Sequence, residues 1–176
     1  MSSRSPIRLL DIVVFAGKAR GMIVAPGIFA PCAIGRSGKS AHKREGDGAT
    51  PVGAFRLRAV LYRPDRVPRP HTTPPVTAIT PASGWCDDPG HPAYNRPVTL
   101  PFGASHERLW RADRLYDLLV VLDYNLARPV PGLGSAIFLH LALAEMAPTA
   151  GCVAVARPTM QQLLSRVDDR TELRIR

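Results

Sequence analysis

The 176-residue sequence has few cysteines, few aromatic residues and no apolar run as long as a membrane span. Its three cysteines, Cys32, Cys86 and Cys152, are an odd number and lie far apart, which argues against a disulfide scaffold and against a zinc knuckle. Aromatic residues make up 6% of the chain, so stacking platforms for single-stranded nucleic acid are scarce. We therefore expect no metal ion and no other cofactor.

Acidic side chains are also in the minority. There are 14 Asp and Glu against 23 Lys and Arg, which gives a net charge of +9. A basic surface attracts polyanions such as nucleic acid, anionic lipid or an acidic cell-wall polymer. No long run of basic residues concentrates this charge, so an ordinary arginine-rich protein and a protein with a polyanionic partner both remain open.

The N-terminal segment "MSSRSPIRLLDIVVFAGKAR" resembles a secretory leader only faintly. Asp11 splits its apolar run, and no small-residue cleavage site follows cleanly. We interpret residues 7–15 as a first strand.

Proline and glycine are abundant, with 18 and 14 residues. Proline interrupts most candidate helices and favours short strands joined by long loops. We expect an irregular proline-rich excursion over 63–82 and short helices over 104–115 and 156–167. Alternating or clustered apolar residues predict strands over 7–15, 21–34, 50–62, 116–125 and 172–176. This length and pattern predict one mainly β domain over residues 1–176.

The segment "FLHLALAEMAPTAGCVAV", residues 138–155, combines two reactive side chains. His140 closes one apolar run and Cys152 opens the next, so two strands could bring an imidazole to a thiol. A catalytic thiol needs an adjacent base and donors for the oxyanion. The amides of Gly151 and Cys152 could supply those donors, and Thr149 could orient the imidazole or bind substrate. The alternative is a buried cysteine that only packs and a histidine whose hydrogen bonds are made within the fold. Either residue taken alone more often has such a structural role.

The residues from His140 through "PTAGCVAV" resemble the active-site motif of the L,D-transpeptidases, the YkuD-type catalytic domain. That motif has a histidine on one strand, followed by Ser or Thr, any residue, Gly and Cys. Upstream, "KREGDGATPVGAFRL" (43–57) resembles the family's G-D-x-x-T-P-x-G-x-F stretch. The segments "GWCDDPGHPAYNRPVTLP" (84–101) and "GSAIFLHL" (134–141) are similar to a proteobacterial branch. The matches follow the family's order, which is more specific than any single motif.

The resemblance implies a YkuD-like β-sandwich of mixed sheets with one or two short helices. It also implies a cysteine acyltransferase that crosslinks peptidoglycan stem peptides, which serve as donor and acceptor. Cys152 would be the nucleophile that forms a thioester, His140 the general base, and Gly151 with Cys152 the oxyanion donors. The family's third partner is usually a backbone carbonyl. We expect a periplasmic monomer without a membrane span or a nucleic-acid partner.

Two departures from the family pattern concern substrate binding. Ala154 stands where the family commonly has arginine, and Leu141 replaces a small residue after the histidine. Another cation must then bind the substrate carboxylate, and the candidates are Arg96, Lys43 and Arg157. The proteobacterial branch makes 1,3 crosslinks, from L-alanine at position 1 to diaminopimelate at position 3, rather than the usual 3,3 type.

A proline-bracketed loop over 85–95 supplies further candidate substrate contacts. We expect Asp88 to bind the ammonium of diaminopimelate, with Trp85 or Tyr94 forming a wall beside it and Asn95 and Arg96 completing the site. Loop packing and Asx turns are the alternative reading of these residues. The four histidines outside the motif lie in polar or proline-rich loops and are expected to be solvated: His42, His71, His91 and His106.

Two other functions remain open at this stage. The same framework could hydrolyse stem peptides without crosslinking them, as an L,D-carboxypeptidase or amidase. Water would then replace the acceptor amine. The chain could also be a basic module that binds cell-wall polymer or nucleic acid, with Cys152 inert.

Overall fold

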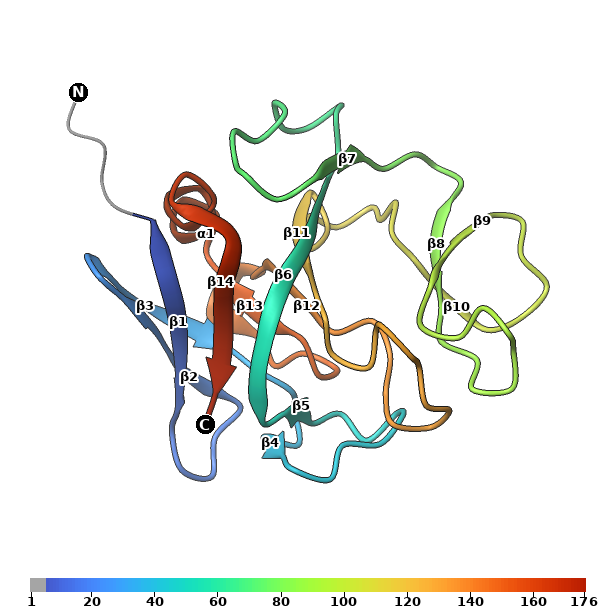
Figure 1. Cartoon of the computed structure of the whole chain (residues 1–176), viewed down its shortest axis with the longest axis horizontal. Helices are drawn as coiled ribbons and strands as arrows, with labels where there is room; N and C mark the ends of the chain where they lie inside the picture. The colour runs from blue at the N-terminus through green and yellow to red at the C-terminus, as the bar shows by residue number, and fades with distance from the viewer. Residues whose placement is uncertain (1–5) are drawn as a thin grey trace.

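The computed structural model describes residues 6–176 and is mainly β (Figure 1). Its large sheet holds nine strands, which are β1 (Ile7–Val14), β2 (Arg20–Ala25), β3 (Ile28–Ala33), β6 (Gly53–Tyr62), β7 (Val76–Ala78), β11 (Leu118–Leu122), β12 (Phe138–Leu141), β13 (Val153–Val155) and β14 (Val167–Ile175). Two smaller sheets contain β8 (Ser83–Cys86), β9 (Pro97–Thr99) and β10 (His106–Arg108), and β4 (Lys39–Ser40) and β5 (Thr50–Pro51).

The large sheet closes into a barrel. Its strand order is β11-β12-β13-β3-β2-β1-β14-β6, and β6 pairs back onto β11, while β7 joins the end of β6. Closure removes the exposed edges of these strands. The mainly β class is confirmed. The expected sandwich is not confirmed, because the large sheet closes on itself instead of facing a second layer of similar size.

Alternation along β11 and β12 divides their side chains between two hydrophobic clusters. Leu118, Val120 and Leu122 join the core shared by all barrel strands, whereas Leu119 and Val121 join a second cluster on the outer face. Successive side chains of a strand point to opposite faces. This confirms that the strand predicted over 116–125 is buried on both faces at its centre.

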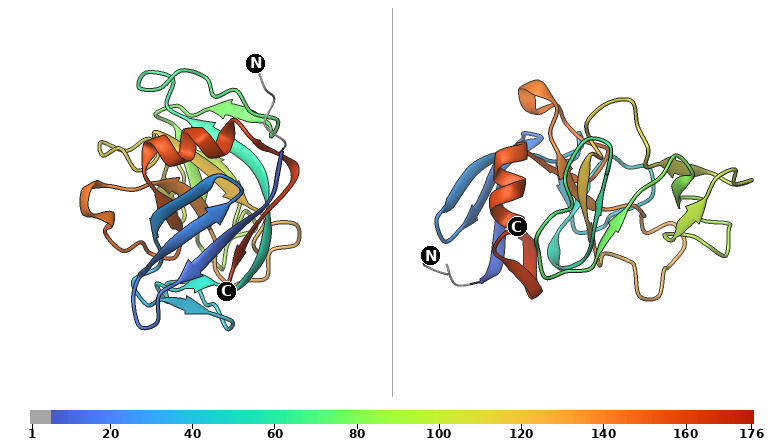
Figure 2. Two further views of the ribbon diagram at one scale, coloured as in Figure 1. Left: turned by 90° about the vertical axis from the view of Figure 1, so that its left-hand side faces the viewer. Right: turned by 90° about the horizontal axis from the view of Figure 1, so that it is seen from above.

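The small β8–β10 sheet covers that outer face of the barrel (Figures 1 and 2). Trp85 of β8 packs edge-on against Phe138 of β12, with ring centroids 5.2 Å apart. The prediction of a helix over 104–115 is wrong, since residues 106–108 form β10 and pair with β8. Pairing with an existing strand satisfies the backbone of so short a segment, and tertiary context routinely outweighs helix propensity.

The helix predicted near the C-terminus is confirmed as α1 (Arg157–Leu164), with Pro158 in its first turn. Its buried face, formed by Met160, Leu163 and Leu164, packs on the core, and Figure 2 shows it lying across one end of the strands. A short 3₁₀ turn, η1 (Ala144–Met146), lies between β12 and β13. No helix within residues 6–176 is long and apolar enough to cross a membrane. Residues 1–5, which begin the segment considered as a leader, lie outside the described residues.

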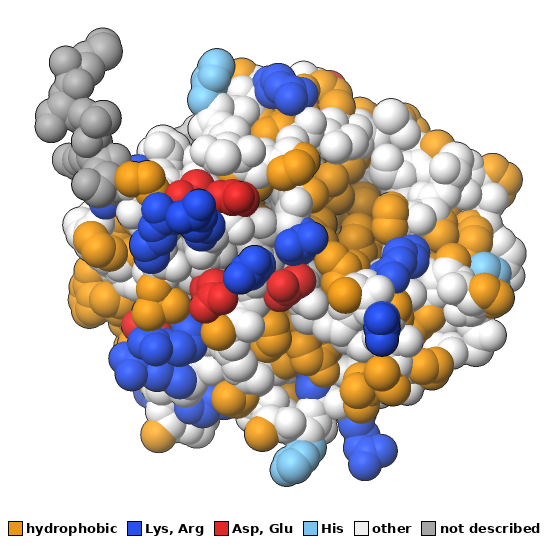
Figure 3. Space-filling view, in the orientation of Figure 1, with side chains coloured by type: hydrophobic (Ala, Val, Ile, Leu, Met, Phe, Trp, Pro, Cys, Tyr) orange, Lys and Arg blue, Asp and Glu red, His pale blue; other side chains and the backbone are white. Residues whose placement is uncertain are grey.

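Part of the arginine excess is paired on the surface. On the face shown in Figure 3, basic and acidic side chains lie next to one another. Between β1 and β14, Arg174 pairs with Asp11 at 2.6 Å and Arg8 with Asp168 at 2.7 Å. This pairing lowers the local positive charge that a polyanion would meet on these strands.

Candidate active site

The parallel pairing of β12 with β13 positions the two reactive residues. In this register Leu139 lies opposite Val153, and His140 lies opposite Ala154. Val153 belongs to the barrel core, so the alternation of the strand turns Cys152 and Ala154 to the outer face. In β12, His140 follows the core residue Leu139, so its side chain also points to the outer face. The imidazole and the thiol therefore lie on one face of two adjacent strands.

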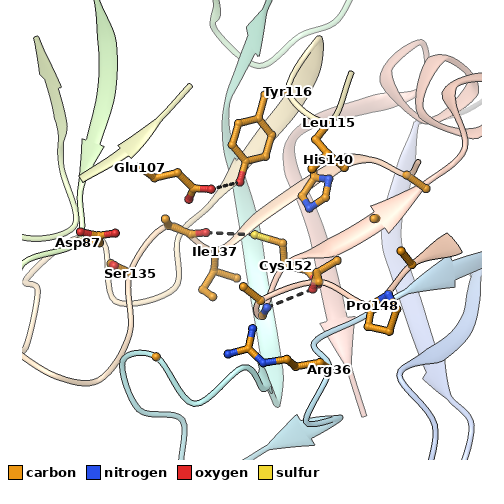
Figure 4. Close-up of a pocket in the computed structure, with 18 of the residues that line it drawn as sticks. Arg36, Asp87, Glu107, Leu115, Tyr116, Ser135, Ile137, His140, Pro148 and Cys152 are labelled. Atoms are coloured by element: carbon orange, nitrogen blue, oxygen red, sulfur yellow. Dashed lines mark hydrogen bonds between the residues drawn. The ribbon is translucent and has the colours of Figure 1, made fainter. Parts of the chain in front are cut away.

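That face forms the floor of a cavity of about 500 Å³ (Figure 4). His140 and Cys152 both line it, together with the loop that joins their strands, including Leu143 and Pro148. The small sheet contributes the opposite side through Asp87 and Glu107. A cavity of this size is within the usual range of small-molecule and peptide side-chain sites.

The Cys152 thiol is held by backbone groups. It donates to the Ala136 carbonyl at 3.2 Å and accepts from the Phe138 amide at 3.3 Å. Only 7% of the residue is exposed, and this burial raises the pKa of the thiol to about 12. Cys152 is therefore a neutral thiol at rest and needs a base to become a nucleophile.

The His140 imidazole has the tautomer that such a base requires. Its Nδ1 lies 2.8 Å from the Leu141 carbonyl oxygen, which can only accept, so Nδ1 carries the proton and Nε2 carries the lone pair. Burial lowers the pKa of His140 to about 4, so the ring is neutral at pH 7. Tyr116 packs edge-on against it, with centroids 5.4 Å apart. The arrangement suits proton transfer during attack, not a preformed thiolate–imidazolium pair.

Thr149 fixes the turn that leads into Cys152. Its hydroxyl donates to the Cys152 carbonyl at 2.6 Å and accepts from the Gly151 amide at 3.1 Å. The hydroxyl is thus bonded to the backbone of the turn, and the Gly151 amide is bonded to it.

Gly151 occupies a position that a larger residue cannot take without strain. Its φ is +142°, and a Cβ added there would lie 2.9 Å from the Ala49 carbonyl oxygen. We expect Gly151→Ala to lower the free energy of unfolding by about 1–3 kcal/mol, the scale of such backbone strain, and to shift Cys152 enough to slow its acylation. Thermal melts and the acylation rate measure the two effects. Gly103→Ala is the matched control, because a Cβ there meets nothing within 4 Å; an equal loss in both variants would contradict this reading.

The loop predicted to contact substrate reaches the cavity through a neighbour of the expected residue. Asp87 lines the cavity, whereas Asp88 is not among its described lining residues. The Asp88 carboxylate accepts from the Gly90 amide at 2.8 Å, which is an Asx turn. Trp85 is 4% exposed and packs in the second cluster, where its indole donates to Asn95 at 2.9 Å.

Tyr94, Asn95 and Arg96 hold loops together outside the lining of the cavity. The Tyr94 hydroxyl donates to Glu45 and accepts from the Gly134 amide at 3.0 Å. The Asn95 side chain accepts from the Ala136 amide at 3.1 Å and donates to two backbone carbonyls of the loop after β11. Within residues 6–176, Arg96 donates to the backbone carbonyls of Asn95, Leu126 and Ala127. These contacts give each of the three side chains a structural role.

Among the cations proposed to replace the family arginine, only Lys43 reaches the cavity. Lys43 is 6% exposed and pairs with Asp47 at 2.6 Å, while Arg157 pairs with Asp117 at 2.9 Å away from the site. Arg36 also lines the cavity, is exposed, and forms no ion pair within residues 6–176. Sequence reasoning missed Arg36, because only tertiary packing places it beside Thr149, whose carbonyl accepts from its amide at 2.8 Å.

Glu107, Arg111 and Tyr116 are further cavity residues that the sequence did not indicate. The Tyr116 hydroxyl donates to Glu107 at 2.5 Å, and Arg111 forms a bidentate pair with Asp113. Burial raises the pKa of Glu107. The signal available in the sequence was weak, since Glu107 and Arg111 belong to a segment predicted as a helix and Tyr116 begins a predicted strand.

The other two cysteines are buried away from this cavity. Cys32 and Cys86 are 1% and 0% exposed, and burial raises the pKa of Cys32 to about 12, as it does for Cys152. Thiol acidity therefore does not distinguish Cys152, but its neighbouring imidazole does. No group of three or more His, Cys, Asp or Glu side chains in the described part of the chain is arranged to hold a metal ion.

Comparison with protein-family models gives a match over residues 19–175 to the L,D-transpeptidase catalytic domain, YkuD. Searches of curated proteins and of solved structures gave no match. The family match covers nearly the whole chain and includes His140 in β12 and Cys152, which directly precedes β13. On this match, the chain belongs to the YkuD family of L,D-transpeptidase catalytic domains.

Proposed function

We propose that this protein is an L,D-transpeptidase that joins two peptidoglycan stem peptides through a thioester on Cys152. The observation that carries the proposal is the pairing of β12 with β13, which turns Cys152 and His140 toward one cavity. The hydrogen bond from His140 Nδ1 to the Leu141 carbonyl leaves Nε2 as the base.

The proposed reaction has two stages. His140 Nε2 takes the thiol proton as the Cys152 sulfur attacks the scissile carbonyl of the donor stem. When the peptide C–N bond breaks, the imidazolium returns that proton to the leaving amine, and the acyl group stays on sulfur. The amine of a second stem then attacks the thioester, the C–S bond breaks, and the thiol re-forms. We assign the Cys152 amide to the oxyanion, since the Gly151 amide is bonded to Thr149.

Incubation with purified peptidoglycan, followed by mass mapping of digested muropeptides, tests the proposal. We expect new crosslinked dimers and, with a carbapenem, a mass adduct on Cys152. Free acids without dimers would indicate the hydrolase instead. An unmodified Cys152 and unchanged peptidoglycan would indicate a binding module.

The same product map shows which stem positions are joined. The resemblance of the 84–101 and 134–141 segments to the proteobacterial branch favours 1,3 links, from L-alanine to diaminopimelate. We place the reaction in the periplasm, where the peptidoglycan substrate lies.

We propose that Arg36 binds a substrate carboxylate. It would replace the family arginine, whose position is occupied here by Ala154. Its guanidinium extends into the cavity below Cys152 (Figure 4). Arg36→Ala should raise KM for a free-carboxylate stem about tenfold, the size of one charge-assisted hydrogen bond, with little change in kcat. Arg58→Ala is the matched control, because Arg58 is exposed on β6 outside the cavity. A KM equal to that of the Arg58 variant would contradict the assignment.

A further inference from the structure

We propose that Asp87 and Glu107, which we call the acid wall, form the subsite for the acceptor amine and favour aminolysis of the thioester over hydrolysis. This inference rests on the proposed function and names the part of the cavity that decides between transferase and hydrolase. It concerns a different step from acylation of Cys152, so the two can be tested separately.

The small sheet brings the two acids together. Asp87 directly follows β8, and Glu107 lies in β10 opposite Trp85. The Asp87 amide donates to the Ser105 carbonyl at 3.2 Å, which ties the two segments side by side. Figure 4 shows both carboxyl groups across the cavity from His140, with the Cys152 sulfur between the two sides. An acyl group on that sulfur would therefore have the acid wall on one side and the base on the other.

The acid wall keeps capacity to accept hydrogen bonds. Asp87 Oδ1 is buried and has no hydrogen-bond partner within residues 6–176. Glu107 accepts from Tyr116, and a carboxylate can accept several donors. A buried carboxylate oxygen without a donor is costly, so Asp87 favours a cationic group close to its carboxylate.

Two of the three Lys and Arg side chains that line the cavity pair with acids outside the acid wall. Arg111 pairs with Asp113 at 2.6 Å, and Lys43 pairs with Asp47 at 2.6 Å. Neither Asp87 nor Glu107 forms an ion pair in the described part of the chain. The two carboxyl groups therefore place acceptors for a cationic ligand on this side of the cavity.

An acceptor amine is such a ligand. Alkyl amines are protonated at neutral pH, and an ammonium cannot attack a thioester until it loses a proton. The acid wall can bind the ammonium and take that first proton on Glu107, whose pKa is raised by burial. The amine then forms the new C–N bond as the C–S bond breaks. Its second proton passes to His140 and then to the Cys152 sulfur. Water is uncharged and gains no comparable attraction, so the amine is selected.

The test measures the ratio of aminolysis to hydrolysis after one acylation. Wild type and the near-isosteric variants Asp87→Asn and Glu107→Gln are acylated with a stem tetrapeptide donor. The acyl-enzyme is then mixed with one of two acceptors. These are meso-diaminopimelate, whose amino groups are protonated at neutral pH, and hydroxylamine, which is uncharged at that pH. Asp88→Asn is the matched control, because it removes one negative charge from the same loop outside the cavity and keeps an oxygen for the Gly90 amide.

We expect both acid-wall variants to lower the amide-to-acid ratio with diaminopimelate by about tenfold, the scale of one charged contact, and to leave the ratio with hydroxylamine near wild type. Asp88→Asn should match wild type with both acceptors. An unchanged ratio, or an equal loss with hydroxylamine, overturns the acid wall as the amine subsite. If Glu107→Gln fails to fold, Asp87→Asn decides alone. Failure of wild-type Cys152 to acylate would instead refute the proposed function.

Discussion

Cys152→Ala should abolish both the carbapenem adduct and the formation of crosslinked products. Only the sulfur of Cys152 lies in the cavity beside a neutral imidazole, and alanine offers no nucleophile. The loss should be complete within detection, because a thioester requires the sulfur that alanine lacks. Intact-protein mass after incubation with a carbapenem and muropeptide mapping measure the two outcomes.

The buried thiols elsewhere provide the control for this experiment. Cys32→Ala and Cys86→Ala remove sulfur from packed positions and should lower the free energy of unfolding by about 1 kcal/mol, as typical substitutions do. Their folded fractions should still form the adduct on Cys152. An adduct on the Cys152→Ala protein, or normal crosslinking by it, would end the acyl-enzyme mechanism.

His140→Ala should slow acylation of Cys152 by 10²-fold or more, the usual scale for the loss of a general base. Burial holds the Cys152 thiol protonated at neutral pH, so attack depends on Nε2 accepting its proton. His106→Ala is a matched control, because His106 lies in β10 and outside the cavity. The acylation rate by stopped-flow or timed mass spectrometry gives the comparison.

The pH profile of wild-type acylation should show where the imidazole titrates. Burial lowers the pKa of His140 to about 4, so the neutral ring that acts as base persists down to that pH. The rate should therefore stay high as the pH falls from 7 to 5 and decline through about pH 4, instead of near 6.5, where an exposed histidine titrates. His140→Ala should lack this acid limb. A wild-type rate with an unchanged profile in His140→Ala would make His140 a packing residue.

The local sequence was sufficient to predict the strand class and to single out His140 and Cys152, which the fold brings to one cavity. Alternating apolar residues predicted β6 and β11, because a strand buried on one or both faces has a recognisable period. Proline near the start of an apolar helix pattern predicted α1. His140 and Cys152 were found because each ends or begins an apolar run, and because the motifs around them follow the order of a known family. These signals are short-range, so a linear reading can detect them.

The rest of the site depends on which strands pair, and pairing is long-range. Parallel alignment of β12 with β13 sets the face of Cys152, and a shift of one residue would turn the thiol into the barrel core. Barrel closure depends on β6 meeting β11, about sixty residues away in the chain. From the sequence we predicted Asp88 as the acid of the site, whereas the structure places Asp87 in the cavity. The pairing of β8 with β10 decides which of these two neighbouring residues faces the cavity. Glu107 and Arg36 entered the site in the same way, through contacts with distant segments that no local pattern encodes.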